Sequence, residues 1–537
     1  MYRYNKRAFD VSIYALLIAA FSLISCNSAP ENLLVFKYNL VNHPNSLDPA
    51  FSKSLSSVWI SGHIFNTLVE TNESSQIIGS LAKSWEISED GLEYTFHLNP
   101  DVYFHHHPQF GPDSTRTVEA SDVVYSLNRI VDPKVNSPGA WIFKDKLASA
   151  NAFEAKDEHT FVLRLKKPFR PLLSILTMPY CSIIPKEIVD FYGLKWKDNP
   201  IGTGPYKFKK WIKNQNLFLS PNENFWRARG NLDGIKINFI VDHKIAYLEL
   251  LNGNLDFVTG LESSFINEML TADGELQPAH QEKIKYLKAA YLNTEYIGIN
   301  LEMLDPSEPL ANADFRKALN YALDKKTMLK TLRNNVGHAA NSAFTPMGLS
   351  SFDSTKAVGY SFDLEKAKLQ LKISGVNPES MEPLTIYTNP PYADIMLFVA
   401  KQWEQLGIMT NLEVVESSIL REGMRNGTVK LFRASWIGDY LDSENFMSVF
   451  YGANSAPPNY TRFNNETFDE LYQRSNLENS NKLRDSIFQK MDRIIIEECP
   501  LIFLFYDQSS NFYSNKIKNI RHNLSNQPFV DLLSKEL

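Results

Sequence analysis

The stretch "LAKSWEISEDGLEYTFHLNPDVYFH" (residues 81–105) is the most informative part of this chain for the fold. Within it, "EYTFHL" (93–98) alternates apolar and polar residues and is rich in β-formers, which predicts a strand. The segment "FVLRL" (161–165) has the same character. Between the two, "TVEASDVVYSLNRIVDP" (117–133) predicts a helix that ends near Pro133. Its apolar stripe consists of Val123, Val124, Leu127 and Ile130.

The second half of the chain has longer helical patterns separated by further strand patterns. Helices are predicted in "DFRKALNYALDKKTMLKTL" (314–332), "DIMLFVAKQWEQLGI" (394–408) and "NKLRDSIFQKMDRIII" (481–496). In the second of these, Gly407 suits the position just after the helix end. Strands are predicted in "PLTIYT" (383–388), "TNLEVVE" (410–416) and "KLFRASW" (430–436). Such alternation of strands and helices predicts an α/β protein with mixed sheets.

The first residues have the pattern of an exported protein. A basic start with Arg3, Lys6 and Arg7 precedes an apolar run from Val11 to Ile24, which is short for a membrane span. Leu23-Ile24-Ser25-Cys26 resembles a bacterial lipobox, so residues 1–25 are predicted to be a lipoprotein signal peptide and Cys26 the lipidated first residue. The alternative is an ordinary cleaved signal with an incidental cysteine. Lipidation predicts a protein tethered to a membrane surface.

Composition excludes some classes of partner. The formal net charge is −6, which argues against non-specific binding of nucleic acid. The length of 537 residues predicts more than one compact unit. Aromatic residues make up 12%, which indicates a large core, an aromatic-lined cleft, or both. Apart from Cys26 the cysteines are Cys181 and Cys499, which read better as buried apolar positions than as a disulfide.

Patterns of known catalytic sites argue against an enzyme. "SLAK" (80–83) fits the S-x-x-K of penicillin-recognising enzymes, but the chain has neither of their S-D-N and K-T-G elements. G-x-S-x-G, H-E-x-x-H, P-loop and C-x-x-C patterns are also absent from the sequence. The run from His105 to His107 is predicted to be a solvated loop without metal, since consecutive side chains of an extended strand point apart.

Several segments, taken in order, resemble the oligopeptide- and dipeptide-binding proteins of bacterial ABC importers, solute-binding protein family 5. The block at 81–105 matches this family best, and "SLDPA" (46–50) resembles its opening. "IGTGPYKFKKW" (201–211) and "FRKALNYALDK" (315–325) resemble two later blocks. "FRASWIGDYLDSENF" (432–446) falls where members have W-x-x-D-Y; the proline that often follows is missing after Asp442.

The resemblance implies an α/β, two-lobed periplasmic-binding-protein fold of the class II or cluster C type, with an extra subdomain in lobe I. Lobe I is expected to be discontinuous, and lobe II to be one continuous segment. The expected boundaries are 26–65, 190–290 and 499–537 for lobe I, 66–189 for the extra subdomain and 291–498 for lobe II.

The resemblance also implies a function. We expect a monomeric, lipid-anchored receptor in the cell envelope, facing the periplasm, that captures a peptide ligand and delivers it to the transmembrane subunits of an ABC permease. No cofactor, metal or nucleic acid is expected. The alternatives are another cargo on the same fold (a nickel chelate, haem, an opine or an oligosaccharide) or a signalling or adhesion lipoprotein without a permease.

Three residues of the 432–446 segment are the candidate ligand-binding residues. The resemblance implies that Asp439 receives the α-ammonium of the peptide and that Arg433 meets a ligand carboxylate. On a regular strand these two side chains share a face roughly 20 Å apart, at about 3.3 Å per residue. Trp436 faces a ligand side chain or the core. The structural alternatives are an internal ion pair for Arg433 and a turn position for Asp439.

Overall fold

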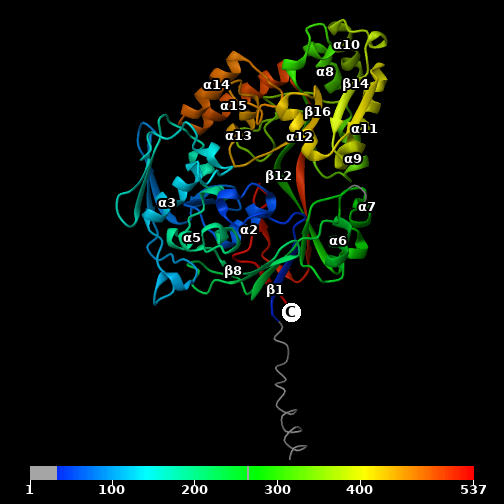
Figure 1. Ribbon diagram of the computed structural model, residues 1–537. Helices are drawn as coiled ribbons and strands as arrows, with labels where there is room; N and C mark the ends of the chain where they lie inside the picture. Colours follow the sequence, from blue (N-terminus) through cyan, green and yellow to red (C-terminus); the bar gives the residue numbers. More distant parts are fainter. Residues whose placement is uncertain (1–32, 263–264) are drawn as a thin grey trace, which may run out of the picture.

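Most strands belong to one mixed sheet that extends through both halves of the molecule (Figure 1). The computed structural model describes residues 33–262 and 265–537, and in this part the sheet has 11 strands. In sheet order they are β15 (Thr410–Val414), β14 (Leu384–Thr388), β16 (Leu431–Ile437), β12 (Ile284–Ile299), β17 (Leu501–Ser514), β11 (Phe257–Thr259), β1 (Val35–Asn39), β10 (Gly234–Asn238), β9 (Asn216–Pro221) and β8 (Tyr206–Ile212), while β13 (His338–Ala339) pairs with β17.

Two long neighbouring strands, β12 and β17, connect the lobes. They are antiparallel, and their pairing is interrupted between Ala290 and Thr294. On the lobe I side of this irregularity β17 pairs with β11, and on the lobe II side β12 pairs with β16 from Asn293 to Ile299. The chain therefore passes between the lobes through adjacent, hydrogen-bonded strands.

Lobe I buries one face of its sheet against helix α2 (Leu55–Ile64). Phe36, Tyr38 and Trp59 are almost fully buried in this core. Ser54 and Ser57 form a capping box that fixes the start of α2. Around β11 and β17, helix α6 (His243–Leu251) covers a second apolar cluster. The remaining elements of this part are α5 (Lys186–Tyr192), α7 (Ile266–Met269) and the short strands β18 (Ile517–Lys518), β19 (Arg521–His522), β20 (Pro528–Phe529) and β21 (Ser534–Lys535).

A separate four-stranded sheet forms the extra subdomain, on the left in Figure 1. Its order is β4 (Ala82–Ile87), β5 (Glu93–Leu98), β7 (Thr160–Arg164) and β6 (Phe153–Ala155), and helix α3 (Ala120–Val131) packs on it. Nearby lie β2 (Val69–Thr71), β3 (Ile77–Gly79) and α4 (Leu172–Ile175). The predicted strand 93–98 is confirmed, with every second residue buried. Val123, Leu127 and Ile130 of α3 are buried as predicted, while Val124 is half-buried.

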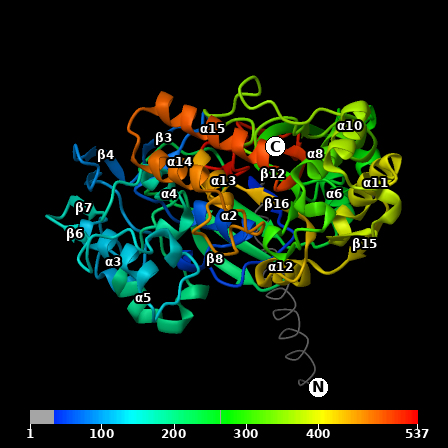
Figure 2. The ribbon, with the colours of Figure 1, turned by 90° about the horizontal axis from the view of Figure 1, so that it is seen from above.

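Helices cover both faces of the lobe II part of the sheet. Figure 2 shows α14 and α15 between the subdomain and the α8–α11 group. The helices are α8 (Ala313–Tyr321), α9 (Lys325–Leu332), α10 (Leu364–Ser374), α11 (Ala393–Trp403), α12 (Ser417–Asn426), α13 (Ser443–Met447), α14 (Glu466–Leu477) and α15 (Asn481–Glu498). Gly407 follows α11 with a φ of 77°, as its predicted position after the helix end requires.

The predicted single helix 314–332 is wrong, because the structure divides it into α8 and α9. Asp324 caps the second helix by accepting a hydrogen bond from the Thr327 N–H. The adjacent Lys325 side chain is buried and donates to the carbonyls of Ala340 and Tyr360, 2.8 Å away in each case. The break therefore places a lysine where it holds the loop that follows α9.

Two further sequence predictions concern polar or reactive residues. The solvated loop predicted at His105–His107 is wrong for His105, which is 1% exposed and lies 2.9 Å from the Gly204 carbonyl. His106 contacts Asn224, and His107 contacts Tyr192, so the three imidazoles have different partners. Cys181 and Cys499 are buried free thiols, as their apolar surroundings predicted. Cys26 and the signal segment lie outside the described residues.

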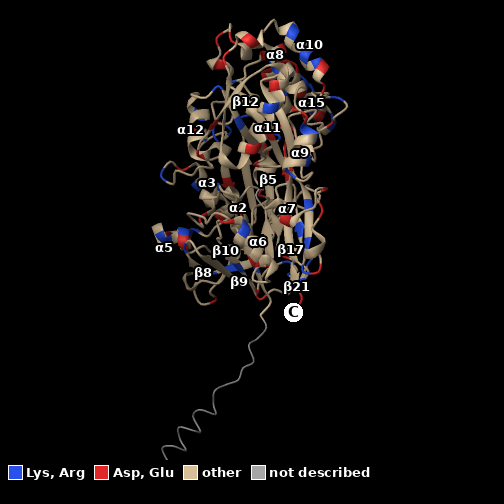
Figure 3. Ribbon diagram, turned by 90° about the vertical axis from the view of Figure 1, so that its right-hand side faces the viewer, with Lys and Arg blue, Asp and Glu red and all other residues tan. Residues whose placement is uncertain are grey.

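Charge and hydropathy complete the description. Basic and acidic residues are interspersed over both lobes in the view of Figure 3. In the part of the chain that the structure describes, no helix combines the length and the hydropathy needed to span a membrane.

Candidate functional site

A cavity of about 610 Å³ lies between the extra subdomain and lobe II, and it contains Asp439. The subdomain contributes Trp141, Lys146 and Phe169 to one wall. Lobe II contributes the segment around Asp439 and the start of α13 to the other. We call this cavity the Asp439 pocket. Its two walls come from segments that are distant in the sequence and belong to different lobes.

Asp439 follows the end of β16, in the turn that leads to α13. Its N–H donates to Oδ1 of Asn445, 3.2 Å away, and the same oxygen accepts from Nε1 of Trp436 at 3.0 Å. Asn445 therefore fixes the turn that presents Asp439. The carboxylate itself lines the pocket, and no lysine, arginine or histidine of the described residues lies within ion-pair distance of it.

The surroundings of Asp439 favour its neutral form. The residue is exposed to the pocket, but the protein atoms around the carboxyl group reduce its hydration. This desolvation raises the pKa of Asp439 to about 6, against a smaller opposing effect of the Asn445 side chain. A cation placed in the pocket would stabilise the ionised carboxylate and lower this pKa.

Trp436 belongs both to the pocket wall and to the core. Its ring is half-buried and packs against the apolar cluster of lobe II. The indole also lines the Asp439 pocket. The packing of Trp436 in the core agrees with one interpretation of the sequence, while its contact with a ligand side chain stays a prediction.

Arg433 lies in a different place from Asp439. Its guanidinium is buried and forms an ion pair with Glu295, whose side chain is fully buried. It also stacks on Tyr392, 3.1 Å from the ring centroid. Burial lowers the pKa of Arg433, but the charge and hydrogen bond of Glu295 together with the nearby Tyr392 and Asp507 more than offset this effect, so the pKa is raised and the guanidinium stays charged. Since β16 ends at Ile437, Arg433 and Asp439 do not share one regular strand.

A second cavity between the lobes, of about 320 Å³, lies beside the β12–β17 connection. Tyr392 lines it, together with Arg333 and Asp507, which form an ion pair at 2.5 Å. Arg333 follows α9, and nothing in the local sequence marks it as a cleft residue.

The lining of the Asp439 pocket includes four further charged residues that sequence reasoning missed: the exposed Lys144 and Asp145, and Lys146 and Glu444. Glu444 is buried and accepts hydrogen bonds from the hydroxyls of Tyr440 and Tyr472, and burial raises its pKa. Lys146, from the subdomain wall, lies 4.9 Å from the Phe169 ring centroid. Glu444 could have been sought because it follows Asp439 closely, but Lys146 is distant in sequence and belongs to no recognisable motif.

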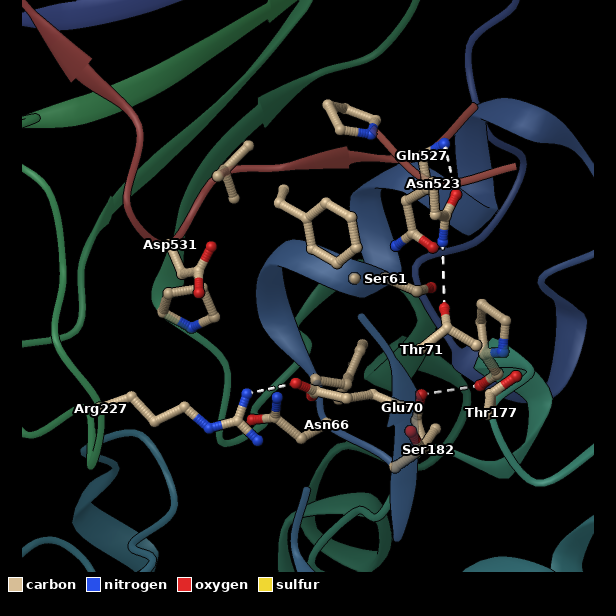
Figure 4. Close-up of a pocket in the computed structure, with 18 of the residues that line it drawn as sticks. Ser61, Asn66, Glu70, Thr71, Thr177, Ser182, Arg227, Asn523, Gln527 and Asp531 are labelled. Atoms are coloured by element: carbon tan, nitrogen blue, oxygen red, sulfur yellow. Dashed lines mark hydrogen bonds and ion pairs between the residues drawn. The ribbon is translucent and has the colours of Figure 1, made fainter. Parts of the chain in front are cut away.

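A third cavity, of about 120 Å³, lies within lobe I beside α2 (Figure 4). Its lining combines hydroxyl and amide side chains with apolar residues and three charged ones. Its charged side chains are already engaged: Glu70 pairs with Arg227, and Asp531 pairs with Arg521. Figure 4 also shows Asn523 directed toward Thr71, 3.1 Å from its hydroxyl. This arrangement suits a hydrated polar cavity whose charges balance internally.

Comparison with known proteins identifies the family. The model of the family described as "Bacterial extracellular solute-binding proteins, family 5 Middle" matches residues 76–458. Heme-binding protein A of Haemophilus influenzae is 30% identical over 467 residues, which cover 82% of this chain and 81% of that protein. Di/tripeptide-binding protein 2 of Pseudomonas aeruginosa is 27% identical over 513 residues, or 91% of this chain and 92% of that protein.

A solved structure supports the fold. The periplasmic binding protein DppA from Helicobacter pylori, determined in complex with the peptide STSA, superposes with a TM-score of 0.75 at 24% identity. The superposition covers 93% of this chain and 98% of that one. The two-lobed α/β fold predicted from the sequence is thereby confirmed. The chain belongs to the bacterial extracellular solute-binding proteins of family 5.

Proposed function

We propose that this protein captures short peptides between its lobes and delivers them to an ABC permease. The observation that carries the proposal is the Asp439 carboxylate, which lines an interlobe pocket and has no lysine, arginine or histidine of the described residues within ion-pair distance. The names of relatives that bind di- and tripeptides support it. The proposed role is binding and transfer without catalysis.

Burial of a free ammonium explains why a carboxylate is needed. When the lobes close around a peptide, its α-ammonium loses water, and an unpaired buried charge costs several kcal/mol. Asp439 offsets this cost and becomes fully ionised in the complex. Segments inside a protein chain lack an α-ammonium, so the same contact selects free peptides.

The second candidate is haem, because heme-binding protein A is the relative with 30% identity. Haem iron usually takes an axial histidine, cysteine, methionine or tyrosine, and its propionates need cations. The described lining of the Asp439 pocket has no histidine, cysteine or methionine, and the hydroxyls of its tyrosines, Tyr440 and Tyr472, already donate to Glu444. Its carboxylates (Asp145, Asp439 and Glu444) outnumber its lysines (Lys144 and Lys146). The pocket chemistry therefore favours a ligand with an ammonium group over haem.

Location, anchoring and assembly are part of the same proposal. We propose a monomer in the periplasm, held at a membrane by lipid on Cys26, with the lobe boundaries given by the resemblance. A Cys26→Ser variant should move from the membrane fraction to the soluble fraction and lose labelling by a clickable fatty-acid analogue. Membrane retention of the variant would refute the anchor.

Native mass spectrometry of the protein lacking residues 1–26, purified from cells, tests the cargo class. We expect additional masses of short peptides that disappear on mild unfolding and refolding. Titration of the refolded protein with an equimolar dipeptide mixture and, separately, with haemin then follows by calorimetry. Binding of haemin without binding of peptides would overturn the proposal.

A further inference from the structure

Lys146 lies on the subdomain side of the Asp439 pocket, and its surroundings support an inference beyond peptide capture itself. The side chain is half-buried, and its ammonium lies over Phe169 at 4.9 Å from the ring centroid. Its nearest hydrogen-bond acceptor is the Trp141 carbonyl, at 3.4 Å. Within the described residues, no carboxylate lies within the 4.0 Å ion-pair limit of its Nζ.

Lys146 is also poorly hydrated. Burial lowers its pKa below the usual value, and the charges of Glu444 and Asp145 offset only part of the effect. The charge of Glu444 has the larger of these two effects, but its two oxygens already accept the hydroxyls of Tyr440 and Tyr472. Lys146 therefore has an electrostatic neighbour and no direct anionic partner.

The wall that carries Lys146 faces the wall that carries Asp439. Trp141 of the subdomain stacks with Tyr440 of lobe II, with ring centroids 6.4 Å apart and planes at 27°. The Ser174 hydroxyl of the subdomain donates to the Leu441 carbonyl at 3.3 Å. These contacts hold the Lys146 ammonium and the Asp439 carboxylate, neither of which has an ion-pair partner among the described residues, in one pocket whose lining also includes the exposed Lys144 and Asp145.

We propose that Lys146 binds a carboxylate of the ligand, so that the pocket selects guests carrying both an ammonium and a carboxylate. The inference rests on the proposed function and adds a second charged group of the ligand, its carboxylate, that the site recognises. A lysine ammonium has no fixed plane, so one carboxylate oxygen satisfies it in many orientations. The carboxylate comes either from the C-terminus of a very short peptide or from an acidic side chain of a longer one.

Selectivity follows from placing the two charged groups on opposite walls. A guest with only an ammonium leaves Lys146 desolvated and unpaired when the lobes close. A guest with only a carboxylate does the same to Asp439. Closure is therefore most favourable for a guest that neutralises both walls at once.

A Lys146→Met variant tests the proposal, because methionine keeps an apolar stem over Phe169 and removes the charge. Dissociation constants are measured by calorimetry for Ala-Ala, Ala-Ala-amide, Glu-Ala-amide and Gln-Ala-amide. Lys134→Met, which removes an exposed lysine of the same subdomain outside the pocket lining, is the matched control. Lys146→Arg tests rescue by charge.

We expect Lys146→Met to weaken one carboxylate-bearing ligand by about 10- to 100-fold, the usual worth of a hydrogen bond to a charged group. A loss for Ala-Ala but not its amide identifies the terminal carboxylate as the partner. A loss for Glu-Ala-amide but not Gln-Ala-amide identifies the side chain. Lys134→Met should leave all four constants within about twofold, as expected for a solvated surface charge, and Lys146→Arg should recover most of the affinity.

Equal dissociation constants for wild type and Lys146→Met, or equal losses for all four ligands, would overturn the role of Lys146 while leaving peptide capture intact. Failure of the wild-type protein to bind any of the peptides would overturn the proposed function, and this inference with it. If Lys146→Met fails to unfold cooperatively, Lys146→Gln replaces it under the same criteria.

Discussion

Asp439→Asn is the substitution whose effect the structure defines most sharply. Asparagine has nearly the same shape as aspartate, so the turn held by Asn445 remains while the charge disappears. Breaking a fully buried charge pair typically costs about 3–5 kcal/mol. Because Asp439 is exposed in the unliganded protein, we expect the lower cost of a lost hydrogen bond between charged groups, about 2–3 kcal/mol. At about 1.4 kcal/mol per tenfold, this is a loss of roughly 30- to 150-fold in affinity.

The assay compares two ligands that differ only at the amino end. Calorimetric titration of wild type and Asp439→Asn with Ala-Ala should show the full loss, whereas N-acetyl-Ala-Ala should bind both proteins weakly and equally. Glu89→Gln, which removes an exposed carboxylate outside the pocket lining, is the control and should leave Ala-Ala binding nearly unchanged. Equal losses for the free and the acetylated peptide would refute the assigned role of Asp439.

Three further predictions follow from the described contacts. The pKa of Asp439 is raised to about 6 and an ammonium binds its ionised form, so dipeptide affinity should rise about tenfold from pH 5 and level off near pH 7. In Asp439→Asn the affinity should be nearly independent of pH over this range, and calorimetric titration at each pH checks both expectations. Glu295→Gln leaves the buried Arg433 charge without its anion and should lower the free energy of unfolding by about 3–5 kcal/mol in urea denaturation, and a double variant with Arg433→Met should be more stable than the single one. Asp492→Ala removes the acceptor of the Phe344 N–H, 2.7 Å away, and should lower the free energy of unfolding by about 1–3 kcal/mol, whereas an unchanged urea midpoint would show that this bond does not contribute.

Local pattern predicted the elements of the fold well where one face of a strand or helix is buried. The strand 93–98 has the predicted bounds, because alternation is the direct consequence of a half-buried sheet. The break between α8 and α9 was missed, because the apolar stripe continues through Ala322 and Leu323 while Asp324 starts a new helix. The apolar periodicity of a sequence indicates which residues are buried, and a capping hydrogen bond at one residue leaves this periodicity unchanged.

The candidate site depended on contacts between distant parts of the chain. Asp439 was reached through the family resemblance, and its position in an interlobe pocket agrees with that expectation. The partner of Arg433 is Glu295, 138 residues away, and a pairing across that separation leaves no signal in either local segment. Lys146 was missed for the same reason, since its significance comes from the opposite wall of the pocket.

The long pair β12 and β17 has a mechanical consequence. Adjacent strands that share a hydrogen-bond ladder bend most readily where the pairing is irregular, here between Ala290 and Thr294 and again between Glu295 and Tyr296, whereas sliding one strand along the other would break the ladder. We therefore expect the lobes to open and close by bending at this short segment and not by sliding. Each closure would then bring the same side chains of the two lobes into contact, because the paired strands keep the lobes in register.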